Sequence, residues 1–373
     1  MNISGGLFVP KSKKPAVVES SHPPAHFFEK QLAGEEPPAL ETMKRLYEAS
    51  VKLFGFAPWE HFFDRQLVLL EDPVSKETCH CLILGALGEV FALQAYIGSE
   101  SYRMHRRMQA GEPLVPQDFF SAMTGAGVEF VMPSELTKPD KELLQALGNP
   151  VKRGARVPVF RAFRPGCQPW YVTGPEAITL MACVEATTAM FLEYLKHPDT
   201  SYWSEPDFYP FMVPSNAEKR GYEIKKVNVP VPPAPVPVPG VLDEARVKRL
   251  REKDYVLKGA FEADHFHSSI IMAEKNARPA FAHIALVSAA TSGFAFPPEI
   301  GDSSRSPGDV LASAVLNAIE TVKFLPAELR VKSSEAKTLL EPLASQLGIT
   351  LRVVKLLPAI ESLKHHLLAY MGR

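Results

Sequence analysis

The chain has 373 residues, 46% hydrophobic and 22% charged, and its 41 basic and 42 acidic residues give a formal net charge of -1. This composition is typical of a globular protein long enough for two domains, each with its own core. The near balance of charges gives no electrostatic reason to expect nucleic acid or an anionic membrane as a partner.

Four cysteines, at 79, 81, 167 and 183, are too few for a disulfide-rich scaffold. The N-terminus lacks the apolar stretch of a signal peptide, and no run of about 18 apolar residues predicts a membrane span. We therefore expect a cytoplasmic protein with free thiols and no membrane partner.

The first predicted domain is α+β and covers residues 38–226, after a flexible arm at 1–37 that is rich in Pro, Ser, Lys and Gly. Hydrophobic periodicity and turn residues predict its first elements. In chain order they are a helix at 38–54, strands at 66–71, 78–84 and 89–97, helices at 100–109 and 116–123, a strand at 128–132, a helix at 134–147 and a hairpin at 157–172.

A strongly apolar helix follows Thr173-Gly174-Pro175-Glu176, with Thr173 as its N-cap and Pro175 in its first turn. Because it is apolar on most sides, we expect it to lie buried against a sheet as the spine of this domain. The aromatic and turn-rich segment 201–226 is predicted to be a strap over the same domain.

Residues 227–241 are predicted to link the two domains. Six prolines between Val227 and Gly240 favour polyproline II, a semi-rigid spacer that rises about 3.1 Å per residue. We expect this segment to make few backbone hydrogen bonds and to separate two cores.

The second domain, 242–373, opens with a charged helix at 242–254 and then three strands, at 257–272, 281–289 and 292–296, joined by turns short enough for antiparallel hairpins. A helix from Pro307, a strand at 328–331, a helix at 335–347, a strand at 349–356 and a helix at 359–370 complete it. We expect a mixed sheet in which the last two strands add in parallel on the first strand's side. This β-β-β-α-β-α-β-α order is the ribonuclease H-like α/β order.

Motifs in this domain resemble the catalytic core of integrases and DDE transposases. Phe261-Glu262-Ala263-Asp264 matches the aromatic-x-x-Asp of that family's first strand, and Glu361 falls near the place of its final Glu. The resemblance implies carboxylates that hold two divalent cations around a phosphodiester. The run Pro326 to Lys332 matches the family's segment that ends in the second metal-binding Asp, so Lys332 stands in the place of that Asp. Its ammonium group would repel a cation instead of binding it.

Most of the chain also resembles uncharacterised bacterial proteins that pair an N-terminal domain of unknown function with this C-terminal domain. The resemblance is carried by four runs, Leu84 to Leu93, Phe160 to Trp170, GAFEAD at 259–264 and LLEPLASQLGI at 339–349. It implies a two-domain architecture and brings no known activity.

Asp264 and Glu361 are the best pair for a divalent metal, because the expected fold brings the first strand beside the last helix. His265 and His267 lie on one face of that strand, and with His283 on the neighbouring strand they form a second candidate, for zinc. A single Cys79-x-Cys81 pair, with no second pair at ligand spacing, does not make a tetrahedral site.

Arg161 and Arg164 lie near Trp170 and are the candidates for contact with a nucleic acid or another partner. Surface charge beside core aromatics is the favoured explanation of the same residues. We interpret the chain as a non-catalytic binding or assembly protein with an eroded metal site at Asp264, Lys332 and Glu361 and no cofactor. The sequence does not identify its partner, and a protein is the class that the charge balance leaves open. The alternative is a nuclease or transposase-like enzyme that uses magnesium or manganese.

Overall fold

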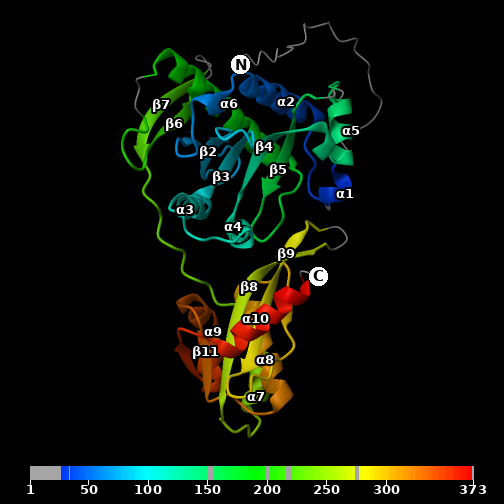
Figure 1. Ribbon diagram of the computed structural model, residues 1–373, viewed down its shortest axis with the longest axis vertical. Coiled ribbons are helices and arrows are strands. Elements are labelled where there is room, and N and C mark those ends of the chain that lie inside the picture. Colours follow the sequence, from blue (N-terminus) through cyan, green and yellow to red (C-terminus); the bar gives the residue numbers. More distant parts are fainter. Residues whose placement is uncertain are drawn as a thin grey trace.

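Two separate mixed sheets organise the chain, one in each of two α+β domains, in a computed structural model that describes residues 27–32, 34–149, 151, 154–198, 202–215, 221–273 and 277–371 (Figure 1). The first domain lies above the second in this view, and the connecting segment runs along one side. Each domain has its own hydrophobic core.

The N-terminal domain is built on a seven-stranded sheet of order β5-β4-β3-β2-β1-β6-β7. Neighbouring strands are antiparallel except β1 and β6, which are parallel. The strands are β1 (Val68–Glu71), β2 (Thr78–Leu84), β3 (Ala92–Ile97), β4 (Gly125–Val131), β5 (Val157–Phe163), β6 (Phe208–Pro214) and β7 (Tyr222–Asn228). The helices are α1 (Glu29–Leu32), α2 (Leu40–Gly55), α3 (Gly98–Gln109), α4 (Pro116–Ala122), α5 (Lys138–Ala146) and α6 (Gly174–Lys196), with short 3₁₀ turns at Pro58–Glu60 and Pro133–Glu135.

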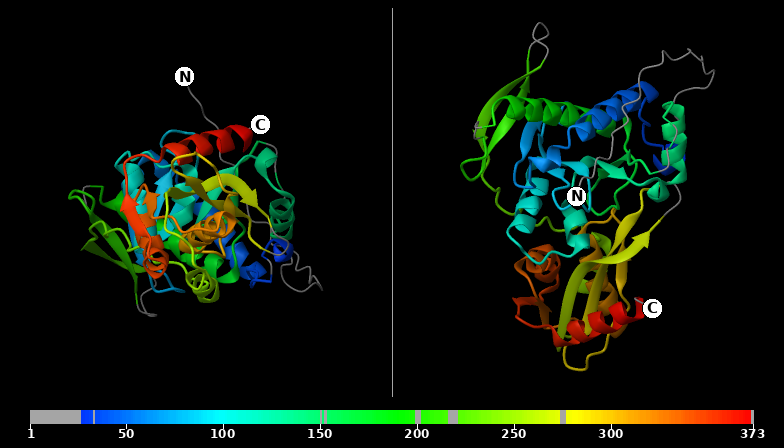
Figure 2. Two further views of the ribbon diagram at one scale, coloured as in Figure 1. Left: turned by 90° about the horizontal axis from the view of Figure 1, so that it is seen from below. Right: turned by 45° about the horizontal axis from the view of Figure 1, so that its top comes forward.

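Helix α6 is the buried spine that its composition predicts. Thr173 is its N-cap and forms a capping box with Glu176, while Pro175 occupies the first turn. Helices α6 and α2 pack together over one face of the sheet, and α3 and α4 lie on the other side (Figure 2). Within the described residues α6 is the one helix long and apolar enough to cross a membrane, but half of its most apolar stretch is buried inside the protein.

Two expectations for this domain need correction. The segment predicted as a strap contains the β6–β7 hairpin, which extends the sheet beyond β1. The last part of the expected flexible arm is packed, because Phe28 and Leu32 are buried in the main core. Residues 1–26 lie outside the described residues.

The proline-rich connection forms no regular secondary structure over most of its length. Val227 and Asn228 still belong to β7, but residues 229–243 form neither helix nor strand. Val236 and Val238 are almost fully exposed, at 79% and 78%. At its end, Gly240 lies against the backbone of Gly308 and Asp309, where an added Cβ would come within 2.3 Å of the Asp309 nitrogen. A side chain at this position would therefore displace the linker from the helix Pro307–Val322, α8.

The C-terminal domain has a five-stranded sheet of order β10-β9-β8-β11-β12. Its elements are α7 (Glu244–Arg251), β8 (Ala260–Met272), β9 (Ala280–Ala289), β10 (Glu299–Gly301), α8 (Pro307–Val322), β11 (Glu328–Val331), α9 (Ser334–Leu347), β12 (Thr350–Val353) and α10 (Pro358–Met371). Strands β8, β9 and β10 are antiparallel, while β11 pairs in parallel with β8 and β12 with β11. The predicted pairing is confirmed, but the third strand lies at 299–301 instead of 292–296, where Thr291 to Gly293 form the turn.

Successive side chains of β8 point to opposite faces of the sheet, so they pack in two different layers. Phe261 and Ala263 join the core formed with α8 and α9, while Phe266 packs with Leu357 and Ile360 under α10. Helix α10 therefore covers the face that carries Glu262 and Asp264.

Candidate functional site

Asp264, the first candidate metal ligand, is held by a lysine of α10. The Lys364 ammonium donates to Asp264 Oδ2 at 2.6 Å, and the two side chains are 26% and 14% exposed. The same ammonium lies 4.8 Å from the centre of the Phe266 ring. A partly desolvated ion pair therefore occupies the carboxylate that a cation would need.

Glu361, the second candidate ligand, is held by Lys332 across a distance of 2.7 Å. The pKa of Lys332 is raised, first by this hydrogen bond and then by the Glu361 charge. Lys332 therefore does not pair with Asp264, because each carboxylate has its own lysine. Each pair is neutral as a whole, so neither of these two carboxylates offers an unpaired charge to a divalent cation.

Glu262 is a functional neighbour that the motif analysis did not single out. It is 2% exposed, and its Oε2 accepts hydrogen bonds from the backbone N–H groups of Ala359 at 2.9 Å and Ile360 at 3.1 Å. These groups belong to the first turn of α10, where helical N–H groups have no partner within the helix. Glu262 thus fixes α10 on the sheet.

The three candidate zinc ligands do converge on one face of the sheet. His265 Nδ1 and His283 Nε2 share a hydrogen bond of 2.9 Å, and the ring centres of His267 and His283 are 4.8 Å apart. Burial lowers the pKa of all three, that of His283 to about 3. Within the part of the chain that the structure describes, however, no three His, Cys, Asp or Glu side chains are arranged to hold a metal ion.

Arg161 and Trp170 make contacts inside the N-terminal domain. Arg161 forms a two-pronged ion pair with the buried Asp140, at 3.0 and 2.7 Å, and its guanidinium lies 4.6 Å from the centre of the Tyr171 ring. Trp170 Nε1 donates to the Gln31 carbonyl at 2.7 Å. These contacts hold the end of the sheet and the N-terminal segment together.

Arg164 instead belongs to an ion cluster at the junction of the two domains. It donates to Glu35 at 2.5 Å and to Glu176 at 2.9 Å. Arg278, from the C-terminal domain, donates to the same two carboxylates, each at 3.0 Å. We call Glu35, Arg164, Glu176 and Arg278 the junction cluster.

The thiols of the Cys79-x-Cys81 pair face Cys183 of α6 in the core. All three residues are fully buried. Hydrogen bonds with Cys79 and Cys81, together with burial, raise the pKa of the Cys183 thiol. The Cys183 thiol is therefore a neutral packing group at physiological pH.

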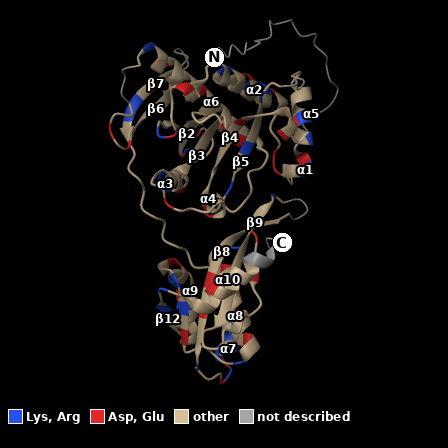
Figure 3. Ribbon diagram, viewed as in Figure 1, with Lys and Arg blue, Asp and Glu red and all other residues tan. Residues whose placement is uncertain are grey.

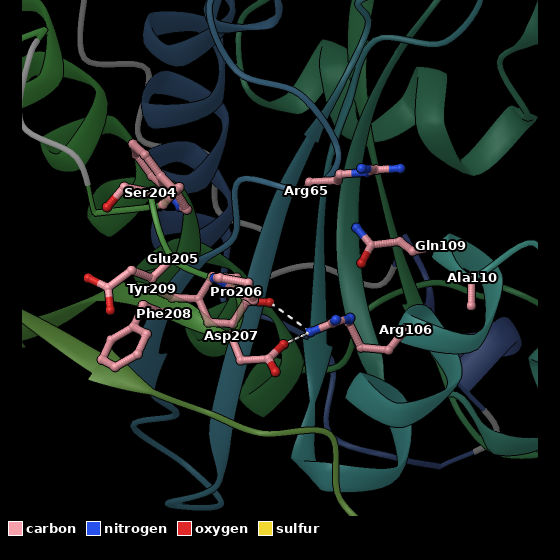
Figure 4. Close-up of a pocket in the computed structure, with 11 residues that line it drawn as sticks. Arg65, Arg106, Gln109, Ala110, Ser204, Glu205, Pro206, Asp207, Phe208 and Tyr209 are labelled. Carbon is pink, nitrogen blue, oxygen red and sulfur yellow. Dashed lines mark hydrogen bonds and ion pairs between the residues drawn. The ribbon is translucent and has the colours of Figure 1, made fainter.

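A cavity of about 480 Å³ lies in the N-terminal domain between the end of α3 and the loop before β6 (Figure 4). Arg106 points into it and donates to Asp207, to the Tyr209 hydroxyl at 3.0 Å and to the Tyr102 hydroxyl at 2.9 Å. The charge at the centre of the cavity is thus used within the protein.

Comparisons with known proteins divide the chain where the two sheets do. Residues 44–209 match the family model of a domain of unknown function (DUF7309), and residues 246–368 match that of another domain of unknown function (DUF6930). No curated protein matches the chain. Both findings agree with the predicted pairing of two uncharacterised domains.

Proposed function

We propose that this chain is a non-catalytic binding protein whose C-terminal domain has a ribonuclease H-like fold with a neutralised metal site. The sheet order β10-β9-β8-β11-β12, with α10 packed across β8 and β9, supports the fold assignment. The observation that carries the functional proposal is the pair of lysines, Lys364 on Asp264 and Lys332 on Glu361.

Two-metal cleavage of a phosphodiester requires several carboxylates that share two cations. Here the remaining carboxylate on the same strand is that of Glu262. Its Oε2 already accepts two backbone hydrogen bonds at the N-terminus of α10. A cation would have to displace two ammonium groups and compete with two backbone N–H groups. The alternative of a nuclease that uses magnesium or manganese is therefore not favoured.

The partner that fits a non-catalytic role is another protein. Positions of lysine and arginine are interspersed with positions of aspartate and glutamate along the ribbons of both domains (Figure 3). Nucleic-acid binding depends on basic patches that release counterions from the phosphate backbone, and the net charge of -1 does not supply that attraction.

Magnesium and manganese should leave the melting temperature of the wild-type protein unchanged, because both carboxylates are already paired. The double variant Lys332→Gln/Lys364→Gln removes both counter-ions and should gain manganese-dependent stabilisation. At ten times the Kd of the metal, that gain is about 1.4 kcal/mol. Thermal unfolding with and without metal measures both results.

The matched control is Lys138→Gln/Lys196→Gln, which removes two lysines from exposed helix pairs and should show no response to metal. A wild-type protein that is stabilised by magnesium and cleaves DNA or RNA, with cleavage abolished in Asp264→Asn, would replace the binding proposal by the nuclease.

A further inference from the structure

Backbone hydrogen bonds join the two domains at one place. Gln168 N–H donates to the Pro279 carbonyl at 2.9 Å, and Phe281 N–H donates to the Gly166 carbonyl at 2.8 Å. The Phe120 and Phe281 rings stack beside this bridge, 5.7 Å apart. The junction is therefore a specific interface, in which backbone hydrogen bonds and stacked rings fix the positions of groups from both domains.

The junction cluster places two guanidinium groups on one carboxylate. Glu35 accepts from Arg164 Nη2 at 2.5 Å and from Arg278 Nε at 3.0 Å. Burial raises the pKa of Glu35, but the hydrogen bonds and charges of Arg278 and Arg164 outweigh it and leave that pKa below its usual value. Two arginines that converge on one oxyanion are the arrangement that recognises carboxylates and phosphates.

Arg278 has a donor left over. Its side chain is 5% exposed, yet its Nη1 has no hydrogen-bond partner. A buried donor without a partner destabilises the folded state, so an acceptor that enters from outside the protein would complete Arg278.

A cavity of about 520 Å³ adjoins this cluster and is lined from both domains. Arg164 and Cys167 contribute from one domain, and Arg278, Ser303 and Ser304 from the other. The Cys167 thiol donates to the Ser303 hydroxyl oxygen at 3.6 Å, which leaves the Ser303 hydroxyl hydrogen for another acceptor. The space is within the usual range for small-molecule sites and exceeds what a single phosphate group fills.

We infer that the junction is a binding site for a small organic phosphate, and that Glu35 occupies the position of its anionic group. With Glu35 in place, Arg164 and Arg278 pair with the carboxylates of Glu35 and Glu176, Asp302 also lines the cavity, and the net charge of these five groups is -1. When Glu35 moves aside, the net charge of the site rises to 0. The donors of Arg164 and Arg278 that Glu35 occupied, and the unpaired Arg278 Nη1, can then bind the ligand.

Asp302 does not compete for the arginines, because its Oδ1 accepts from the Ser304 hydroxyl at 2.6 Å. Glu35 can leave without unfolding the segment around it, since Phe28 and Leu32 anchor that segment in the core. The inference deepens the proposed function, because it gives a binding protein a ligand class and a site that spans both domains.

Binding of glucose 6-phosphate to the full chain, measured by calorimetry at constant ionic strength, tests the site. Glu35→Gln removes the competing charge and should lower the Kd at least about tenfold relative to the wild type. Adding Arg278→Lys to that variant should abolish the gain, because a lysine cannot supply the fork of donors. Glu36→Gln, which changes a neighbouring carboxylate outside the cluster, should bind like the wild type.

Inorganic phosphate, titrated in parallel, distinguishes the source of the phosphate group. Equal affinities for both probes would support the site and assign it to phosphate itself. Equal affinities of Glu35→Gln, Glu36→Gln and wild type, or no binding to any of them, would overturn the inference.

A Ser303→Cys background shows whether each variant keeps its domains docked, since Cys167 then lies opposite a second thiol and the two cross-link on oxidation. A variant that cross-links but gains no affinity counts against the site. The magnesium and manganese titration is independent of this experiment, so failure here leaves the neutralised metal site standing.

Discussion

Replacing Glu262 by alanine should lower the free energy of unfolding by about 3 kcal/mol. The substitution removes a buried carboxylate that accepts two backbone hydrogen bonds at the start of α10. Loss of an N-terminal cap costs about 0.5 to 2 kcal/mol, and the space left under the helix adds to that cost. The Ala359 and Ile360 N–H groups would then be buried without an acceptor.

Two variants separate the capping role from a general loss of charge. Glu262→Gln keeps an oxygen acceptor of the same reach, so it should cost about 1 kcal/mol, mainly the lost interaction of the charge with the helix dipole. Glu335→Ala removes an exposed carboxylate from the first turn of α9 and should cost no more than about 0.5 kcal/mol. Urea unfolding measures all three. Equal losses in Glu262→Ala and Glu335→Ala would show that Glu262 does not hold α10.

Local pattern predicted much of the C-terminal domain because turn and cap residues mark the ends of its helices and strands. The strand Glu328–Val331 was located to the residue, and Gly348, with a φ of 68°, ends α9 where the sequence places its stop. The third strand was misplaced because Phe296 is buried like a strand residue. Its N–H does bond to the Val287 carbonyl, but the regular ladder forms three residues later, at 299–301.

In the N-terminal domain, the missed hairpin shows where local pattern fails. Strand β6 contains Pro210, and proline favours a loop or an edge strand over a central strand. Its parallel partner β1 lies far away in the sequence. Parallel pairing leaves no turn signal between the two strands. The sheet order around β6 is therefore set by packing on α6 and not by any motif in 201–226.

The candidate site was predictable in its carboxylates but not in their partners. Asp264 and Glu361 follow from motif position, whereas Lys364 reaches Asp264 only because α10 lies across β8. Glu262 could have been found, because it lies two residues before Asp264 and so on the same face of a buried strand. The contact between Glu35 and Arg278 spans 243 residues, and no local pattern reports it.

Acid should destabilise the protein well before its carboxylates titrate, because three buried histidines stay neutral in the folded state. His80, His105 and His283 are each 2% exposed. Burial, as the largest cause, lowers the pKa of His80 and His105 to about 4 and that of His283 to about 3, from an ordinary value of 6.5. The unfolded chain therefore takes up protons below 6.5 that the folded chain does not.

The direction of the pH dependence follows from this difference in proton uptake between the unfolded and the folded chain. Stability is fully present above about pH 6.5 and falls as the pH drops toward the folded-state pKa, by up to about 1.4 kcal/mol per pH unit for each histidine. At about pH 5 the three together should cost on the order of 5 kcal/mol. Urea unfolding at a series of pH values between these limits gives the slope, which counts the protons.

His80→Asn tests one of the three histidines directly. The amide can still donate to the Tyr96 carbonyl, as His80 Nδ1 does at 3.2 Å, but it cannot titrate, so the slope should fall by one proton. The exposed His365→Asn is the control and should leave the slope unchanged. A wild-type slope of less than one proton, or equal slopes in both variants, would mean that the buried imidazoles accept protons without loss of structure.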